Sequence, residues 1–108
     1  MNSIVVWVVK SRHIKPNNFY VKVDGSDFYT AYWVANKSSE QQATSLVLET
    51  CDELILGQVE IEEVIEYSGQ QISNIPEVDT VIKEAKEKHV IPNDTQLAAW
   101  ISSQGGMW

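Results

Sequence analysis

The sequence predicts an α+β protein, with a four-stranded mixed sheet and helices packed on one face of it. Three observations carry this expectation: a continuous apolar, β-branched run over Ile4 to Val9, alternating segments around Asp24-Gly25, and two amphipathic stretches that follow helix-start signals. The chain has 108 residues, enough for one ordinary domain and too few for two. We therefore expect a single domain over residues 1–108.

The apolar run favours a strand that is buried on both faces, and so a place in the middle of the sheet. Phe19 to Asp24 alternates in polarity and leads into Asp24-Gly25, a hairpin signal because a type I′ turn needs positive φ. The next strand is expected from Ser26 to about Ala35. This hairpin register places Tyr20 opposite Tyr29.

A helix is expected after Ser38 and Ser39, because each serine is followed three residues later by a glutamine and so forms a capping box. Gly57 is expected just beyond its end. The inner stripe of this helix recurs at spacings of three and four: Ala43, Leu46, Val47, Thr50, Cys51, Leu54 and Ile55.

The segment Gln58 to Tyr67 alternates as a fourth strand, except that Glu63 interrupts its apolar face. A position at the sheet edge, or a bulge at Glu62-Glu63, would explain the interruption. Pro76 then suits the first turn of a second helix, and Pro92 ends it. A short third helix, capped by Asn93 or Asp94, would bury Leu97, Trp100 and Ile101.

The expected order along the chain is β-β-β-α-β-α-α. A right-handed crossover through the first helix would bring the fourth strand beside the first. With the strands numbered along the chain, the order across the sheet is then 3-2-1-4, and the acidic fourth strand forms one edge.

Charge is distributed unevenly along the chain, whose formal net charge is −7. Residues 1–37 hold five cations against two acids, whereas residues 38–79 hold ten acids and no lysine or arginine. Such a block either keeps the protein apart from its own copies or docks a basic partner. The docking surface would consist of Glu49, Asp52, Glu53, Glu60, Glu62 and Glu66.

Cations and aromatic residues suggest a second surface, used for nucleic acid or for dimerisation. Its candidate residues are Lys10, Arg12 and Lys15 beside Tyr20, Tyr29 and Trp33. Cations beside stacking aromatics are typical of single-strand nucleic-acid binders, but the acidic balance argues against this use. Helices on one face would leave the other open, so we expect a homodimer or a covering C-terminal segment.

Catalytic and metal-binding signals are weak. Cys51 lies on the inner helix stripe and is expected to be an inert thiol, His13 to be solvated in a loop, and His89 to be structural near a helix end. No metal-ligand spacing or nucleophile motif occurs, so we expect no metal, no cofactor and no enzyme. Glu63 alone, if it faced the core, would be a candidate catalytic carboxylate.

These observations favour a small acidic binding or regulatory protein, of the inhibitor or immunity type, that is not an enzyme and docks a basic protein partner. Two alternatives stay open: a single-strand nucleic-acid-binding module, and a small enzyme with a carboxylate site. The chain has one cysteine, a longest apolar run too short to cross a bilayer, and a poor signal-peptide pattern. We therefore expect a cytoplasmic protein without a membrane span.

Overall fold

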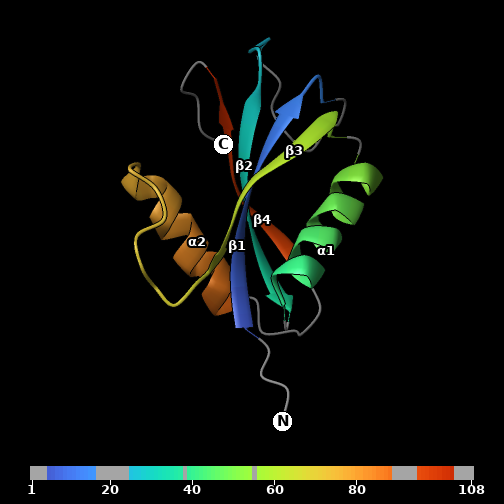
Figure 1. Cartoon of the computed structure of the whole chain (residues 1–108). Helices are drawn as coiled ribbons and strands as arrows, with labels where there is room; N and C mark the ends of the chain where they lie inside the picture. Colours follow the sequence, from blue (N-terminus) through green and yellow to red (C-terminus); the bar gives the residue numbers. More distant parts are fainter. Residues whose placement is uncertain (1–4, 17–24, 38, 55, 89–94, 104–108) are drawn as a thin grey trace.

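The computed structural model describes residues 5–16, 25–37, 39–54, 56–88 and 95–103. Four strands form one antiparallel sheet in the order β3-β1-β2-β4. The α+β class and the four-stranded sheet are confirmed (Figure 1). The elements along the chain are β1 (Val5–Ile14), β2 (Tyr29–Lys37), α1 (Glu40–Glu53), β3 (Gln58–Glu66), α2 (Pro76–Lys88) and β4 (Thr95–Ser102).

Strand β1 lies between β3 and β2, as its apolar run predicts. Val8 is 1% exposed and Val9 is fully buried, so the strand is covered on both faces. The strand continues through Lys10 to Ile14 and so includes His13, which was expected in a loop. It continues because Ser11 and His13 form hydrogen bonds on the buried side, while Lys10 and Arg12 reach the opposite face.

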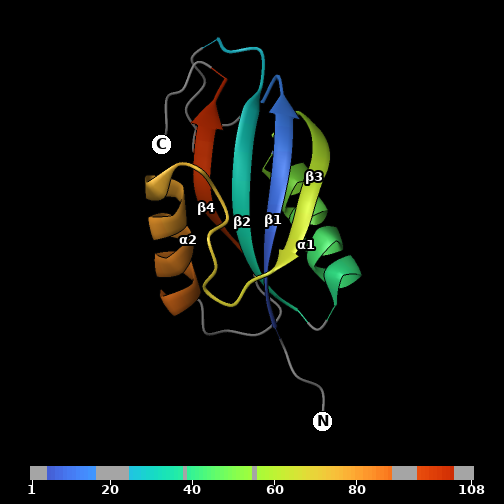
Figure 2. The ribbon, with the colours of Figure 1, turned by 60° about the vertical axis from the view of Figure 1, so that its left-hand side comes forward.

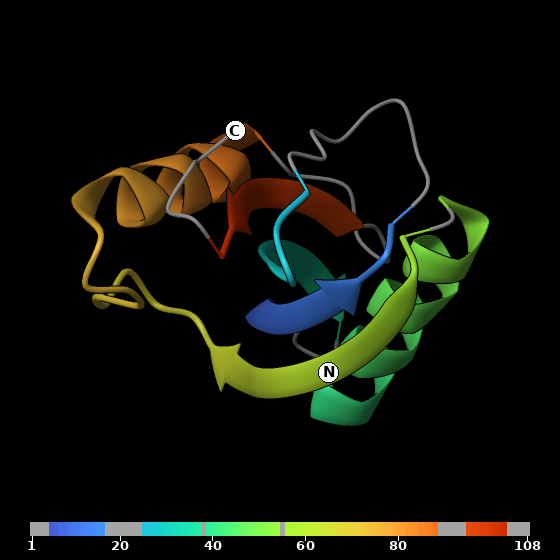
Figure 3. The ribbon, with the colours of Figure 1, turned by 90° about the horizontal axis from the view of Figure 1, so that it is seen from above.

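The helices lie on opposite faces of the sheet, which differs from the expected packing on one face (Figures 2 and 3). Helix α1 packs its inner residues against a cluster that contains Val9 and Trp33. Helix α2 packs against Val8 and Val34. Successive residues of a strand point to opposite faces, so the two clusters lie on opposite sides. The physical reason is that β1 and β2 are apolar on both sides, and each side needs a cover.

The C-terminal segment is the strand β4, and the expected third helix is wrong. Leu97 and Trp100 are three residues apart, a spacing that suggests one face of a helix. In the sheet they lie opposite Trp33 and Ala31, on the α1 side, because the register shifts between Tyr32 and Trp33. The bulge thus produces helix-like spacing within a strand.

Strand β2 is paired with β1 up to Lys37 and with β4 up to Ala35. Tyr29 lies opposite His13 of β1 and Ser102 of β4. The expected pairing of Tyr20 with Tyr29 is therefore wrong, and the sheet is antiparallel throughout rather than mixed. Gly25 has the positive φ (+82°) that the expected turn needs, but residues 17–24, which include Asp24, lie outside the described residues.

Strand β3 is an edge strand with a bulge, as expected from the interrupted alternation. Lys10 lies opposite Glu63 and Ser11 lies opposite Ile61, so Glu62 is the additional residue. Glu60 and Glu63, three residues apart, therefore share the α2 face of the sheet. The bulge accounts for the acid that interrupts the apolar pattern.

Gly57 connects α1 to β3 at a close approach of two backbones. Helix α1 has its C-cap at Leu54, earlier than the sequence predicts, so Gly57 is not the residue that ends the helix. Its φ is +81°, and a Cβ at this position would collide with the backbone carbonyl of Ile14. Only glycine meets both conditions.

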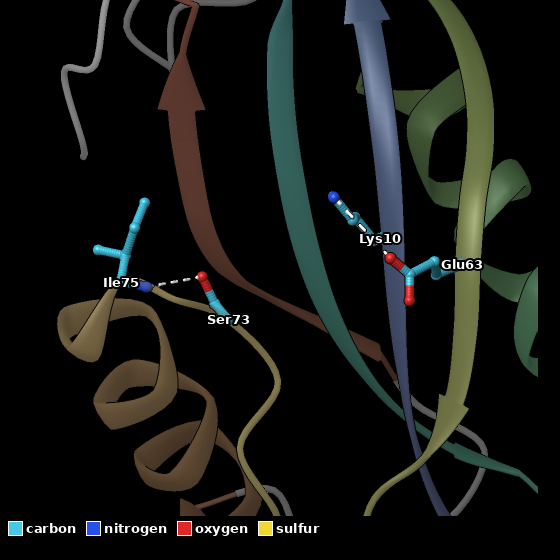
Figure 4. Close-up of polar contacts among 4 residues, drawn as sticks. All are labelled: Lys10, Glu63, Ser73 and Ile75. Carbon is cyan, nitrogen blue, oxygen red and sulfur yellow. Dashed lines mark hydrogen bonds and ion pairs between the residues drawn. The ribbon is translucent and has the colours of Figure 1, made fainter.

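Helix α2 begins at Pro76, as predicted, and the loop before it is fastened by hydrogen bonds. Asp79 Oδ1 accepts from the backbone N–H groups of Ile72 (2.7 Å) and Ser73 (3.2 Å). Ser73 Oγ accepts from the N–H of Ile75 at 3.1 Å (Figure 4). The expected roles of His89 and of Asn93 or Asp94 fall outside the described residues.

Candidate functional site

Helix α1 presents three acids to solvent because its apolar stripe faces the sheet. The helix starts at Ser39, whose Oγ accepts a hydrogen bond from the Gln42 N–H at 3.2 Å. Ala43, Val47 and Cys51 are buried against the sheet. The outer side carries the exposed residues Glu49, Asp52 and Glu53, and the last turn contains no basic residue.

Strand β3 adds three exposed acids beside this helix. Because β3 is at the sheet edge, its acids reach solvent on either face and at the bulge. Helix α1 contacts β3, and the end of the helix leads directly into that strand (Figure 1). We call the exposed acids of these two adjoining elements the acidic surface: Glu49, Asp52 and Glu53 on α1, and Glu60, Glu62 and Glu66 on β3, of which Glu60 lies on the α2 face of the sheet.

The acidic surface is not neutralised from within the described part of the chain. No described lysine or arginine lies within 4.0 Å of a carboxylate oxygen of these six residues. The ion pair nearest to them joins Lys10 Nζ to Glu63 Oε1 at 3.9 Å, on the α2 face of the sheet (Figure 4). Unpaired carboxylates keep their charge available to a partner.

Glu63 does not face the core. Its side chain is 56% exposed, and the bulge turns it toward Lys10. The carboxylate therefore lacks the apolar surroundings that would prepare it as a general acid.

Leu48 is an exposed apolar residue among the acids of α1 and is not among the residues predicted for this surface. It is 41% exposed and lies next to Glu49 and four residues before Asp52. A neighbouring hollow of about 280 Å³ is lined by Lys37, Gln41, Gln42, Ser45, Leu46 and Glu49. The signal in the sequence was a leucine outside the inner stripe, where polar residues are expected.

The structure separates the predicted cations from the predicted aromatics. Tyr29 and Trp33 are 1% exposed and lie in the core under α1, while Tyr20 is outside the described residues. Lys10 and Arg12 lie on the other face of β1, and Lys15 follows the end of that strand. There the Arg12 guanidinium stacks 3.9 Å from the ring of Phe28, and Lys10 Nζ lies 6.0 Å from the ring of Tyr32.

His13 is buried in a chain of hydrogen bonds, so the expectation of a solvated histidine is wrong. Trp33 Nε1–H donates to Ser11 Oγ at 2.8 Å, and the Ser11 hydroxyl donates to His13 Nε2 at 2.6 Å. His13 Nδ1–H donates to the carbonyl of Leu56 at 3.1 Å. The neutral Nδ1–H tautomer satisfies every group of this relay.

Burial lowers the pKa of His13 from 6.5 to about 4, and the hydrogen bond to Leu56 opposes the shift. The ring of Trp100 lies 5.0 Å from the imidazole and stacks on Tyr29 at 5.1 Å. Ser11 and His13 resemble a nucleophile with its base, but neither side chain is exposed, so no substrate reaches them. The relay acts as part of the core.

Cys51 lies in the same core, as predicted. Burial raises the pKa of its thiol to about 12, so thiolate is scarce at neutral pH. Within the described ranges, no group of three or more His, Cys, Asp or Glu side chains is placed to hold a metal ion.

Comparison with protein-family models, with curated proteins and with solved structures finds no match to this chain. Across the described residues, none of the helices combines the length and the apolar character needed to cross a membrane.

Proposed function

We propose that this protein is a small acidic binding or regulatory protein, of the inhibitor or immunity type, that docks a basic protein partner through α1 and β3. The observation that carries the proposal is the acidic surface itself: six exposed carboxylates on two adjoining elements, with no described cation in ion-pair contact. Charge of one sign on one surface speeds encounter with a partner of opposite sign and disfavours other partners.

Leu48 supports the same proposal because charge alone makes a weak interface. Stable protein interfaces combine buried apolar residues at the centre with a polar rim. Leu48 lies among Glu49 and Asp52 in such an arrangement, exposed in the free protein. A partner with an apolar pocket ringed by lysine or arginine would fit it.

The two alternative functions draw less support. Single-strand nucleic-acid binding needs accessible aromatic rings beside cations, and Tyr29 and Trp33 are in the core. A carboxylate enzyme would need an acid in an apolar cleft, and Glu63 is solvated beside Lys10. A homodimer and a cytoplasmic location stay predictions; the exposed patch of Tyr29 and Trp33 that suggested the dimer is absent.

The proposal is tested by affinity capture from the native cell with two charge variants as bait. One variant neutralises α1 (Glu49→Gln, Asp52→Asn and Glu53→Gln), and a matched control neutralises exposed acids of α2 (Glu77→Gln, Glu84→Gln and Glu87→Gln). We expect the control to retain the partner of the wild type and the α1 variant to lose it.

Calorimetry with the purified partner then measures affinity at low and at physiological ionic strength. A drop of about tenfold or more for the α1 variant alone, together with weaker binding at higher salt, supports docking through this surface. Equal loss in both variants, or no loss in either, would exclude it.

A further inference from the structure

The edge of the sheet at β3 offers backbone hydrogen-bonding groups as well as charge. Among the described residues, β3 pairs with β1 alone and is the outermost strand on its side of the sheet (Figure 3). An edge strand has donors and acceptors along its outer side that another strand can pair with.

The orientation of these groups follows from one hydrogen bond. The Tyr67 N–H donates to the carbonyl of Val6 at 2.8 Å, so Tyr67 turns its backbone toward β1. In an antiparallel pair, alternate residues face the partner strand, which places Ile65 and Glu63 inward as well. Val64 and Glu66 therefore turn their backbone N–H and C=O groups outward.

The negative charge of β3 disfavours pairing of this edge with a second copy of the chain. Two β3 strands side by side would bring their acids together: Glu60, Glu62, Glu63 and Glu66 from each copy. Like charges on neighbouring strands are destabilising, and the bulge at Glu62 twists the edge away from a flat ladder. The same acids attract a strand that carries lysine or arginine.

Side chains on both faces of β3 favour an alternating basic segment. Val64 and Glu66 project on the α1 face, while Glu63 and Ile65 project on the α2 face. Each face thus presents one acid and one half-buried aliphatic residue to an added strand. Cross-strand pairs of opposite charge and of aliphatic groups are the ones that stabilise neighbouring strands.

We propose that the basic partner docks by adding an extended segment, rich in lysine or arginine, as a fifth strand on the outer edge of β3 beside Val64 and Glu66. The proposal rests on the proposed function and states how the partner is held. Main-chain hydrogen bonds supply the geometry, and the glutamates select the charge. The exposed acids of α1, the helix that contacts β3, add negative charge on the α1 side of the sheet.

The test uses the full-length protein and a synthetic peptide of about ten residues in which lysine alternates with valine. A second peptide has the same sequence but is methylated on the backbone nitrogens of both edges, which keeps its charge and removes the N–H groups that would pair with β3. Two-dimensional NMR follows hydrogen exchange at individual amides. Variants Glu60→Gln with Glu62→Gln, and the matched control Glu77→Gln with Glu84→Gln on α2, separate the local charge from the net charge.

We expect the first peptide to bind with an affinity that falls as salt is added. Its binding should slow hydrogen exchange at the amides of Val64 and Glu66. Exchange at the Ile65 amide, which is already bonded to β1, should change little. The methylated peptide should bind the wild-type protein at least about tenfold less tightly than the first peptide does. The first peptide should also bind the β3 variant at least about tenfold less tightly, and should bind the α2 control as tightly as the wild type.

Each failure is distinguishable. Equal, salt-dependent binding of both peptides without protection at Val64 and Glu66 overturns strand addition and leaves docking by charge in place. No binding of either peptide at low ionic strength overturns strand addition, and the proposed function falls as well if the α1 variant retains the captured partner. Concentration-dependent protection of these two amides in the protein alone would mean that a second copy occupies the edge.

Discussion

Under α1 the sheet presents aromatic rings and hydrogen-bonded polar groups, whereas under α2 it presents mainly aliphatic side chains. The α1 side holds Trp33, Trp100 and the Ser11–His13 relay. The α2 side holds Val8 and Val34 against the helix. Polar groups in a core need particular partners, whereas aliphatic groups need only volume. The α1 side should therefore be the less tolerant of change.

The largest expected difference concerns two glycines with positive φ. Gly57→Ala should destabilise the protein by about 4 kcal/mol, because it adds a backbone collision with Ile14 to the cost of φ +81°. Gly69→Ala, in the loop before α2, has φ +99° and open space, so about 1 kcal/mol is expected. Urea denaturation of both variants measures the difference. Equal midpoints would mean that the Gly57 approach is not tight.

Acid should destabilise the α1 side through His13. Its pKa is 6.5 when unfolded and about 4 when folded, so between these values the unfolded chain binds the additional proton. Stability is therefore retained above pH 6.5 and lost as pH falls toward 4, by about 3 kcal/mol in all. Chemical denaturation at a series of pH values measures this slope. His13→Gln should flatten it, whereas Val78→Ala on the α2 side should leave it unchanged; a wild-type slope in His13→Gln would refute the assignment.

Replacing Ser11, the middle residue of the relay, should destabilise the protein less than protonating His13 does. Ser11→Ala leaves the Trp33 N–H and His13 Nε2 without partners, which should cost about 2 kcal/mol. Its neighbour Lys10 points to the other face, where Lys10→Ala loses a partly exposed ion pair with Glu63 and a 6.0 Å contact with the Tyr32 ring, and should cost less than about 1 kcal/mol. Thermal unfolding of the two variants compares adjacent positions of one strand. Similar costs would contradict the difference between the faces.

A smaller effect than at Ser11 is expected at Cys51, in the same core. Cys51→Ala should cost about 1 kcal/mol through lost packing. In the native protein the thiol should react slowly with a disulfide reagent, because it is buried and its pKa is about 12. A cysteine introduced by Ser45→Cys in the Cys51→Ala background, exposed on the same helix, provides the fast reference. Reaction of Cys51 at that reference rate would show that the core under α1 opens readily.

Local signals predicted the elements whose patterns follow one simple period. The run through Val9 is a buried central strand, Ser39 caps α1, Pro76 starts α2, and Glu62 marks a bulge at an edge. The acidic surface was also predictable, because unpaired charges must stay in water wherever the chain goes. Leu48 was not, since its exposure depends on which stripe of α1 faces the sheet.

The predictions that are wrong concern residues whose environment is determined by tertiary contacts and not by the local sequence. His13 looks solvated within a polar stretch, but the Leu56 carbonyl and Ser11 satisfy it inside the core. Leu97 and Trp100 suggest a helix because the bulge that separates them is a property of the pairing with β2. Helix α2 covers the second face by packing on β2 and β4, a long-range contact that no local pattern specifies.

Because Glu62 is the additional residue of the bulge, deleting it would leave the other side chains of β3 on their present faces of the sheet. If Glu62 were deleted, Ile61 would precede Glu63 directly, and the alternation would run unbroken through the strand with every side chain on its present face. Such a shortened chain should still fold with a regular β3 edge, on which Glu60, Glu63 and Glu66 would still oppose pairing between copies. The additional glutamate therefore adds a bulge and a fourth charge to an edge that the other acids already keep from self-pairing.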